Sequence, residues 1–136
     1  MEESFGENFL GLDWGASYVG VSFADAETRM AFAVCALKND KTLSARLGEL
    51  FREKEAGTVV IGRASHVNRP DMVPGGEKLG DAIRKAYPSI RIEYQEEMFT
   101  TKMASANLRE HGIRNIARFD DQESARIILQ EWLDNR

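Results

Sequence analysis

The chain has 136 residues, of which 43% are hydrophobic and 29% are charged, and its formal net charge at pH 7 is −4. This composition is ordinary for a soluble globular protein and argues against disordered and fibrous classes. Because no apolar run approaches the roughly 18 residues of a membrane span and the acidic start lacks the features of a signal peptide, we expect a single cytoplasmic domain over residues 1–136 that does not bind membranes.

The first half of the chain predicts a run of strands and then a change of period. Alternating apolar residues and short turns predict three consecutive strands, as in an antiparallel meander, at residues 8–14, 18–24 and 29–37. Helical spacing of apolar side chains from Leu43 to Phe51 predicts a helix, which Gly57 is expected to stop. An apolar strand at 58–62 and a loop at 63–76 follow.

The second half alternates helices with a strand. Apolar spacing between Leu79 and Ala86 predicts a helix that Pro88 ends, followed by a strand at 89–94. A further helix is expected from Thr100 or Thr101 to about His111, and a last one over 121–134. The order βββαβαβα predicts an α/β protein with one mixed five-stranded sheet and helices on both faces, which is the order of the ribonuclease H-like fold.

Asp13 is unusual because it lies inside the first predicted strand. Alternation leaves Leu10, Leu12 and Trp14 on one face, so Gly11 and Asp13 share the other face. An aspartate at a strand end often accepts hydrogen bonds from the following turn, which is one interpretation. In the other, Asp13 is a metal ligand, and its small neighbours leave room for ions and a nucleic-acid backbone.

Two further acidic positions are candidates for the same site. Glu96 and Glu97 fall at the carboxyl end of the fifth strand, where open α/β sheets carry their chemistry, and spacing alone favours neither. In the last helix, Asp120 and Glu123 resemble a capping box, which would leave Asp121 in line with the buried stripe. Asp121 is then either a partner of the helix dipole or a metal ligand.

Carboxylates from the first strand, a later strand end and the last helix could converge. Their mutual repulsion would make this arrangement unfavourable without a cation. Oxygen-only ligands suit Mg²⁺ or Mn²⁺, and two such ions about 3.5–4 Å apart can hold the attacking and leaving oxygens of a phosphodiester displacement. If these three carboxylates meet, the site would suit metal-dependent cleavage of a phosphodiester bond.

Four motifs in this order resemble one family. The opening "LGLDWGASYVGVSFAD", the strand "VVIG", the segment "EEMFTT" and the closing "DDQESARIILQEWLD" are similar to motifs of the YqgF/RuvX family. Its members are Holliday-junction-resolvase-like proteins associated with the processing of pre-16S ribosomal RNA. The resemblance implies catalytic, metal-binding acids at Asp13, Glu97 and Asp121, and thereby selects Glu97 over Glu96. It implies Mg²⁺ or Mn²⁺ as cofactor, and a ribosomal RNA precursor or branched DNA as substrate.

The chain also departs from the family pattern. Met98 stands where the family has an arginine after the glutamate, and "GRA" replaces a Gly-x-Pro after the central strand. These changes spare the three acids but remove groups expected to hold a nucleic-acid backbone.

Basic residues are concentrated in two segments. Residues 63–91 contain six bases and three acids, and residues 102–118 contain four bases and one acid, so each segment has a charge of +3. Arg63, Arg69 and Arg109 are therefore candidates for phosphate contacts. A homodimer would offer a second such surface.

Two other functions remain open. A non-catalytic RNA-binding or ribosome-assembly factor could keep the fold without cleavage. An actin-like ATP-binding domain also has an Asp-x-Gly hairpin, but such proteins close two domains around the nucleotide. Metal-dependent cleavage would separate the nuclease from the binding factor.

Overall fold

The computed structural model describes residues 4–64, 75–97 and 116–136. Within them, five strands and three helices follow one another, in the order β1 (Asn8–Trp14), β2 (Tyr18–Ala24), β3 (Phe32–Lys38), α1 (Leu43–Glu53), β4 (Ala56–Ala64), α2 (Gly75–Ala86), β5 (Arg91–Glu97) and α4 (Ile116–Asp134). The predicted helix between Thr100 and His111 lies outside the described residues.

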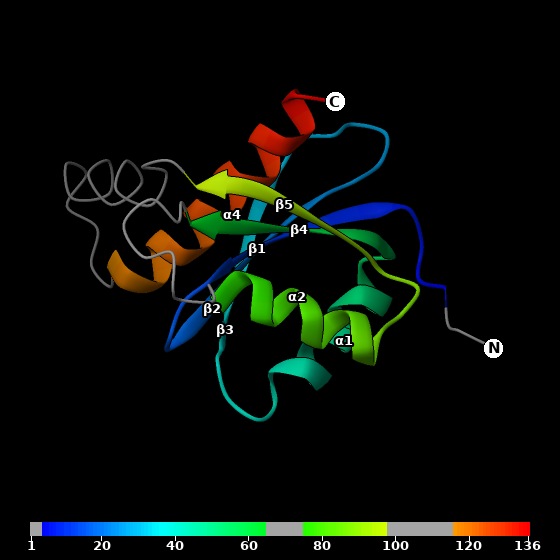
Figure 1. Cartoon of the computed structure of the whole chain (residues 1–136). Helices are drawn as coiled ribbons and strands as arrows, with labels where there is room; N and C mark the ends of the chain where they lie inside the picture. The colour runs from blue at the N-terminus through cyan, green and yellow to red at the C-terminus, as the bar shows by residue number, and fades with distance from the viewer. Residues whose placement is uncertain (1–3, 65–74, 98–115) are drawn as a thin grey trace.

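The strands form one mixed sheet in the spatial order β3-β2-β1-β4-β5. β1 pairs with β2, and β2 with β3, in antiparallel fashion, whereas β1 with β4 and β4 with β5 are parallel. Figure 1 shows α1 and α2 on one side of this sheet and α4 on the other. The predicted mixed five-stranded sheet with helices on both faces is confirmed.

Each face of the sheet has its own apolar core. On one face, Leu10 and Leu12 of β1 pack with Leu47 and Phe51 of α1 and with Ile83 of α2. On the other, residues of α4 form a smaller cluster with Val60 of β4, and this cluster includes Ile128, Leu129, Trp132 and Leu133. The two cores hold α1 and α2 against one face of the sheet and α4 against the other.

Several predicted boundaries are wrong by a few residues. β4 begins at Ala56 and already includes Gly57, so Gly57 does not end α1. The left-handed turn after α1 is made by Glu55, whose φ is 52°. β4 also extends through Arg63, whereas the predicted loop begins at this residue. β3 begins at Phe32 and not at residue 29.

None of the helices in the described ranges is long and apolar enough to cross a membrane.

Candidate active site

Asp13 lies near the carboxyl end of β1, the central strand of the sheet, and its side chain is only 5% exposed. Leu10 and Leu12 are buried on the face covered by α1 and α2. Because successive side chains of a strand alternate, Gly11 and Asp13 fall on the face covered by α4. The predicted alternation in β1 is thereby confirmed.

Gly11 is required for the close approach of α4. A Cβ atom at Gly11 would lie 2.7 Å from Cβ of Leu129 and 2.8 Å from the carbonyl oxygen of Ala125. Ser22, the partner of Gly11 on β2, donates a 2.7 Å hydrogen bond from its hydroxyl to that same carbonyl. The interpretation that Gly11 leaves space for ions and a nucleic-acid backbone is therefore wrong, because α4 fills this space.

Asp121 reaches the same face of the sheet from α4. Gly20 of β2 is the cross-strand partner of Asp13, and a side chain at Gly20 would run into the backbone carbonyl of Asp121. Cross-strand partners have Cα atoms about 4.5–5.5 Å apart, so the backbone of Asp121 lies close to Asp13. Oδ1 of Asp121 would lie 3.9 Å from a Cβ atom added at Gly15, in the turn that follows β1. The structure thus brings Asp121 to the end of β1 that carries Asp13.

The predicted capping box at the start of this helix is wrong. α4 begins at Ile116, so Asp120 lies inside the helix and is not its N-cap. Glu123 instead forms an ion pair with Arg126, three residues further along, with 2.5 Å between Oε1 and Nη2. Asp121 lies in the second helical turn, whereas the helix dipole acts mainly within the first. The dipole interpretation of Asp121 therefore loses support.

The two glutamates at the end of β5 have different surroundings. Glu96 is the register partner of Arg63 on β4, and Nη2 of Arg63 donates a 2.8 Å hydrogen bond to its Oε1. Residue 97 is the last residue of β5 and is paired with Ala64. The Glu97 side chain lies outside the described residues.

Arg63 lies on the face covered by α2. Its Nη1 is 3.7 Å from Oε1 of Glu77 in the first turn of α2, and its guanidinium carbon is 5.5 Å from the centre of the Tyr94 ring. Burial raises the pKa of the Tyr94 phenol above its ordinary value of 10.0. The other predicted phosphate contacts, Arg69 and Arg109, lie outside the described residues.

Sequence reasoning missed two contacts of this region. The bond from Ser22 to α4 follows a recognisable signal, because Gly20 and Ser22 are small residues on one face of β2. The contact between Arg63 and Glu96 has no comparable signal, since it depends on the register of two parallel strands that are separated by a helix.

The chemistry of the candidate ligands suits a hard cation. Asp13 and Asp121 offer carboxylate oxygens, which Mg²⁺ and Mn²⁺ prefer over nitrogen or sulfur. Among the described residues, no three histidine, cysteine or acidic side chains gather as a metal site would require. The described part of the chain therefore supplies two of the three predicted ligands, on one face of the sheet.

Comparisons with known proteins agree with this fold. A family described as "RuvX: Holliday junction resolvase" matches residues 7–135. A "Putative pre-16S rRNA nuclease" of Burkholderia vietnamiensis is 31% identical over 133 residues, covering 93% of this chain and 88% of the relative. A protein of the same name in Burkholderia multivorans is 30% identical over 132 residues, with coverages of 92% and 87%.

Solved structures of resolvases share the fold at low sequence identity. A Fowlpox virus resolvase in complex with Holliday junction DNA superposes with a TM-score of 0.60 and 9% identity, covering 95% of this chain and 98% of that one. RuvC of Thermus thermophilus in complex with a Holliday junction substrate gives a TM-score of 0.57 at 16% identity, with coverages of 95% and 94%. These likenesses concern the fold alone.

Proposed function

Because this chain belongs to the RuvX family of Holliday junction resolvases, we propose that it is a metal-dependent endonuclease that hydrolyses phosphodiester bonds in structured nucleic acid. Its relatives are named as pre-16S rRNA nucleases. We therefore propose a ribosomal RNA precursor as the first substrate to test and four-way DNA as the second. We also infer that it acts in the cytoplasm, where its one cysteine, Cys35, would stay reduced.

The observation that carries this proposal is the approach of α4 to β1. Asp13 and Asp121 are far apart in the sequence, yet the backbone of Asp121 packs on Gly20, the cross-strand partner of Asp13. Asp13 is buried on the central strand of the sheet, with only 5% of its surface exposed. A second carboxylate nearby adds repulsion that a bound cation would relieve.

Glu97 is proposed as the third ligand. The ion pair between Glu96 and Arg63 supports this choice, because it occupies the neighbouring carboxylate on the α2 side. Alternation along β5 assigns residue 97 to the same side of the sheet as Asp13. A set of two aspartates and one glutamate has the charge and the oxygen ligands that suit one or two Mg²⁺ or Mn²⁺ ions.

Each part of the chain has a distinct task in this proposal. Asp13, Glu97 and Asp121 would hold the metal, which when bound supplies the Lewis acid for phosphodiester hydrolysis. The rigid β1 strand fixes Asp13, and the packing of α4 on Gly11 and Gly20 fixes Asp121. Arg69 and Arg109 remain predicted contacts to the phosphate backbone.

The alternative is a binding factor that has lost cleavage. Met98, in place of the family's arginine, is the feature that favours it. The test is to incubate the purified protein with structured ribosomal RNA precursor and with four-way DNA, in Mg²⁺, in Mn²⁺ and in excess chelator. We expect cleavage with either metal and none with chelator. Tight binding without cleavage in both metals would favour the binding factor instead.

A further inference from the structure

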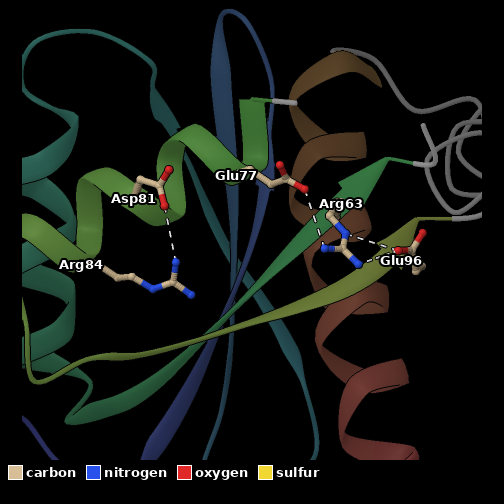
Figure 2. Close-up of polar contacts among 5 residues, drawn as sticks. All are labelled: Arg63, Glu77, Asp81, Arg84 and Glu96. Atoms are coloured by element: carbon tan, nitrogen blue, oxygen red, sulfur yellow. Dashed lines mark hydrogen bonds and ion pairs between the residues drawn. The ribbon is translucent and has the colours of Figure 1, made fainter. Parts of the chain in front are cut away.

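Arg63 joins three elements at one corner of the sheet. It is the penultimate residue of β4, and its guanidinium lies between Glu96 on β5 and Glu77 in the first turn of α2 (Figure 2). Both Nε and Nη2 of Arg63 donate to Oε1 of Glu96, at 3.3 and 2.8 Å. The planar guanidinium therefore binds the end of β5 through two donors at once.

This contact matters because β5 is an edge strand. Among the strands that the structure describes, β4 alone pairs with β5, and none of them lies on the outer side of β5. Strand ends open more easily than strand centres because fewer contacts hold them. The contact of Arg63 with Glu96 anchors the residue that directly precedes Glu97, the proposed metal ligand.

The same contacts argue against a direct role for Arg63 on the nucleic acid. Its guanidinium already faces two carboxylates and the Tyr94 ring, on the face covered by α2. Asp13 lies on the opposite face, which α4 covers. A phosphate bound near Asp13 would therefore lie on the opposite face of the sheet from Arg63.

We propose that Arg63 is a positioning residue, which holds the end of β5 through Glu96 and so sets the position of Glu97 for metal binding. This inference rests on the proposed function. The side chains of Arg63 and Glu96 are 36% and 51% exposed, and half-exposed ion pairs have modest effects. We expect loss of the pair to raise the Mn²⁺ concentration needed for half-maximal binding by about threefold to fivefold.

Arg84 provides a matched control. It is an arginine on α2 whose guanidinium carbon is 5.9 Å from the centre of the same Tyr94 ring. Its ion pair, however, is with Asp81 on its own helix, at 3.4 Å, and not with β5 (Figure 2). Arg84→Gln removes the same charge from the same region without releasing the end of β5.

The experiment compares wild type, Arg63→Gln, Glu96→Gln, the double variant and Arg84→Gln. Mn²⁺ binding is followed by electron paramagnetic resonance of the free ion, and opening of β5 by amide hydrogen exchange at residues 95–97. We expect Arg63→Gln and Glu96→Gln each to bind Mn²⁺ more weakly and to exchange faster at these amides. The double variant should bind Mn²⁺ as well as the single variants do, because both substitutions remove the same contact between Arg63 and Glu96. Arg84→Gln should match wild type in both measurements.

Three results would overturn the inference, and they are distinguishable. If wild type binds Mn²⁺ and cleaves while Arg63→Gln binds Mn²⁺ equally well, Arg63 does not position Glu97 and the proposed function stands. If Arg63→Gln instead lowers the salt dependence of nucleic-acid binding by about one unit of slope, Arg63 contacts a phosphate. If wild type neither binds Mn²⁺ nor cleaves, the proposed function fails and the positioning role fails with it.

Discussion

Asp13 and Gly20 are partners across the antiparallel ladder of β1 and β2, and the absence of a side chain at Gly20 lets α4 approach Asp13. The carbonyl and Cα of Asp121 occupy the space that a side chain at Gly20 would need. One glycine therefore sets how closely the backbone of the second aspartate approaches the first. The packing of α4 and the geometry of the proposed site are consequently linked.

Gly20→Ala should reduce both stability and activity. Its methyl group would push α4 outward, and overpacking of this kind typically costs about 1–3 kcal/mol. Urea unfolding would measure the stability change, and cleavage at a temperature where the variant is fully folded would measure activity. Gly57→Ala is the control, because its methyl group would meet the backbone of Gly6 near the other end of the sheet, where β1 begins. A Gly20→Ala variant with wild-type cleavage would show that the position of Asp121 does not matter.

The alternation of β1 could be predicted because it depends only on neighbouring residues. Leu10 and Leu12 had to be buried on one face, and this fixed the direction of Asp13. The role of Gly11 could not be predicted, because it depends on how closely a helix more than 100 residues later packs on the sheet. A glycine inside a strand indicates that another group packs closely against it, but the sequence does not identify that group.

Local signals also misled at element ends. Asp120 and Glu123 have the spacing of a capping box, yet α4 begins at Ile116 and Glu123 pairs with Arg126. Side chains three residues apart are neighbours on a helix, so a glutamate with this spacing can form an ion pair in place of a capping box. At the end of α1, the residue with a left-handed backbone is Glu55 and not the nearby Gly57. Gly57 already lies in β4, where its backbone packs closely against Gly6.

Asp13→Asn should abolish cleavage while the protein stays folded. The amide has nearly the same volume as the carboxylate but lacks its charge, so packing against α4 is kept and metal binding is lost. Asp25→Asn is the matched control, because Asp25 accepts hydrogen bonds in an exposed turn from the amides of Glu27 and Thr28, and asparagine makes such turns equally well. Thermal unfolding and cleavage should be measured together. Collapse of the Asp13→Asn fold would favour a structural role for Asp13.

Asp40 should contribute to the pH dependence of stability. The hydroxyl and the amide of Thr42 donate hydrogen bonds to its carboxylate, at 2.6 and 2.8 Å, and lower the pKa of Asp40 below its ordinary value of 3.8. A lowered folded-state pKa stabilises the fold above the unfolded-state pKa, and this stabilisation disappears as the pH falls through the folded-state pKa. Asp40→Ala should therefore be less stable than wild type at pH 7, and the difference should shrink below about pH 4.

Urea unfolding between pH 7 and pH 3 tests the role of Asp40. Asp40→Asn keeps a hydrogen-bond acceptor beside Thr42 but does not titrate, so its stability should fall less steeply than that of wild type in acid. Parallel pH profiles for wild type and both variants would show that the hydrogen bonds from Thr42 do not stabilise the ionised carboxylate.

Asp121→Asn should weaken the stabilisation of the protein by Mg²⁺. A ligand that binds only the folded state raises its stability by about 2.7 kcal/mol when present at 100 times its Kd. Removing one of the three proposed carboxylate ligands should weaken Mg²⁺ binding, so at the same Mg²⁺ concentration the Tm of the variant should rise less than that of wild type. Glu131→Gln, on the same helix but more than two turns away from Asp121, should respond to Mg²⁺ as wild type does.

Because Asp121 lies beyond the first turn of α4, the helix dipole contributes little to this comparison. Equal Tm shifts for wild type and Asp121→Asn would exclude Asp121 from the metal site.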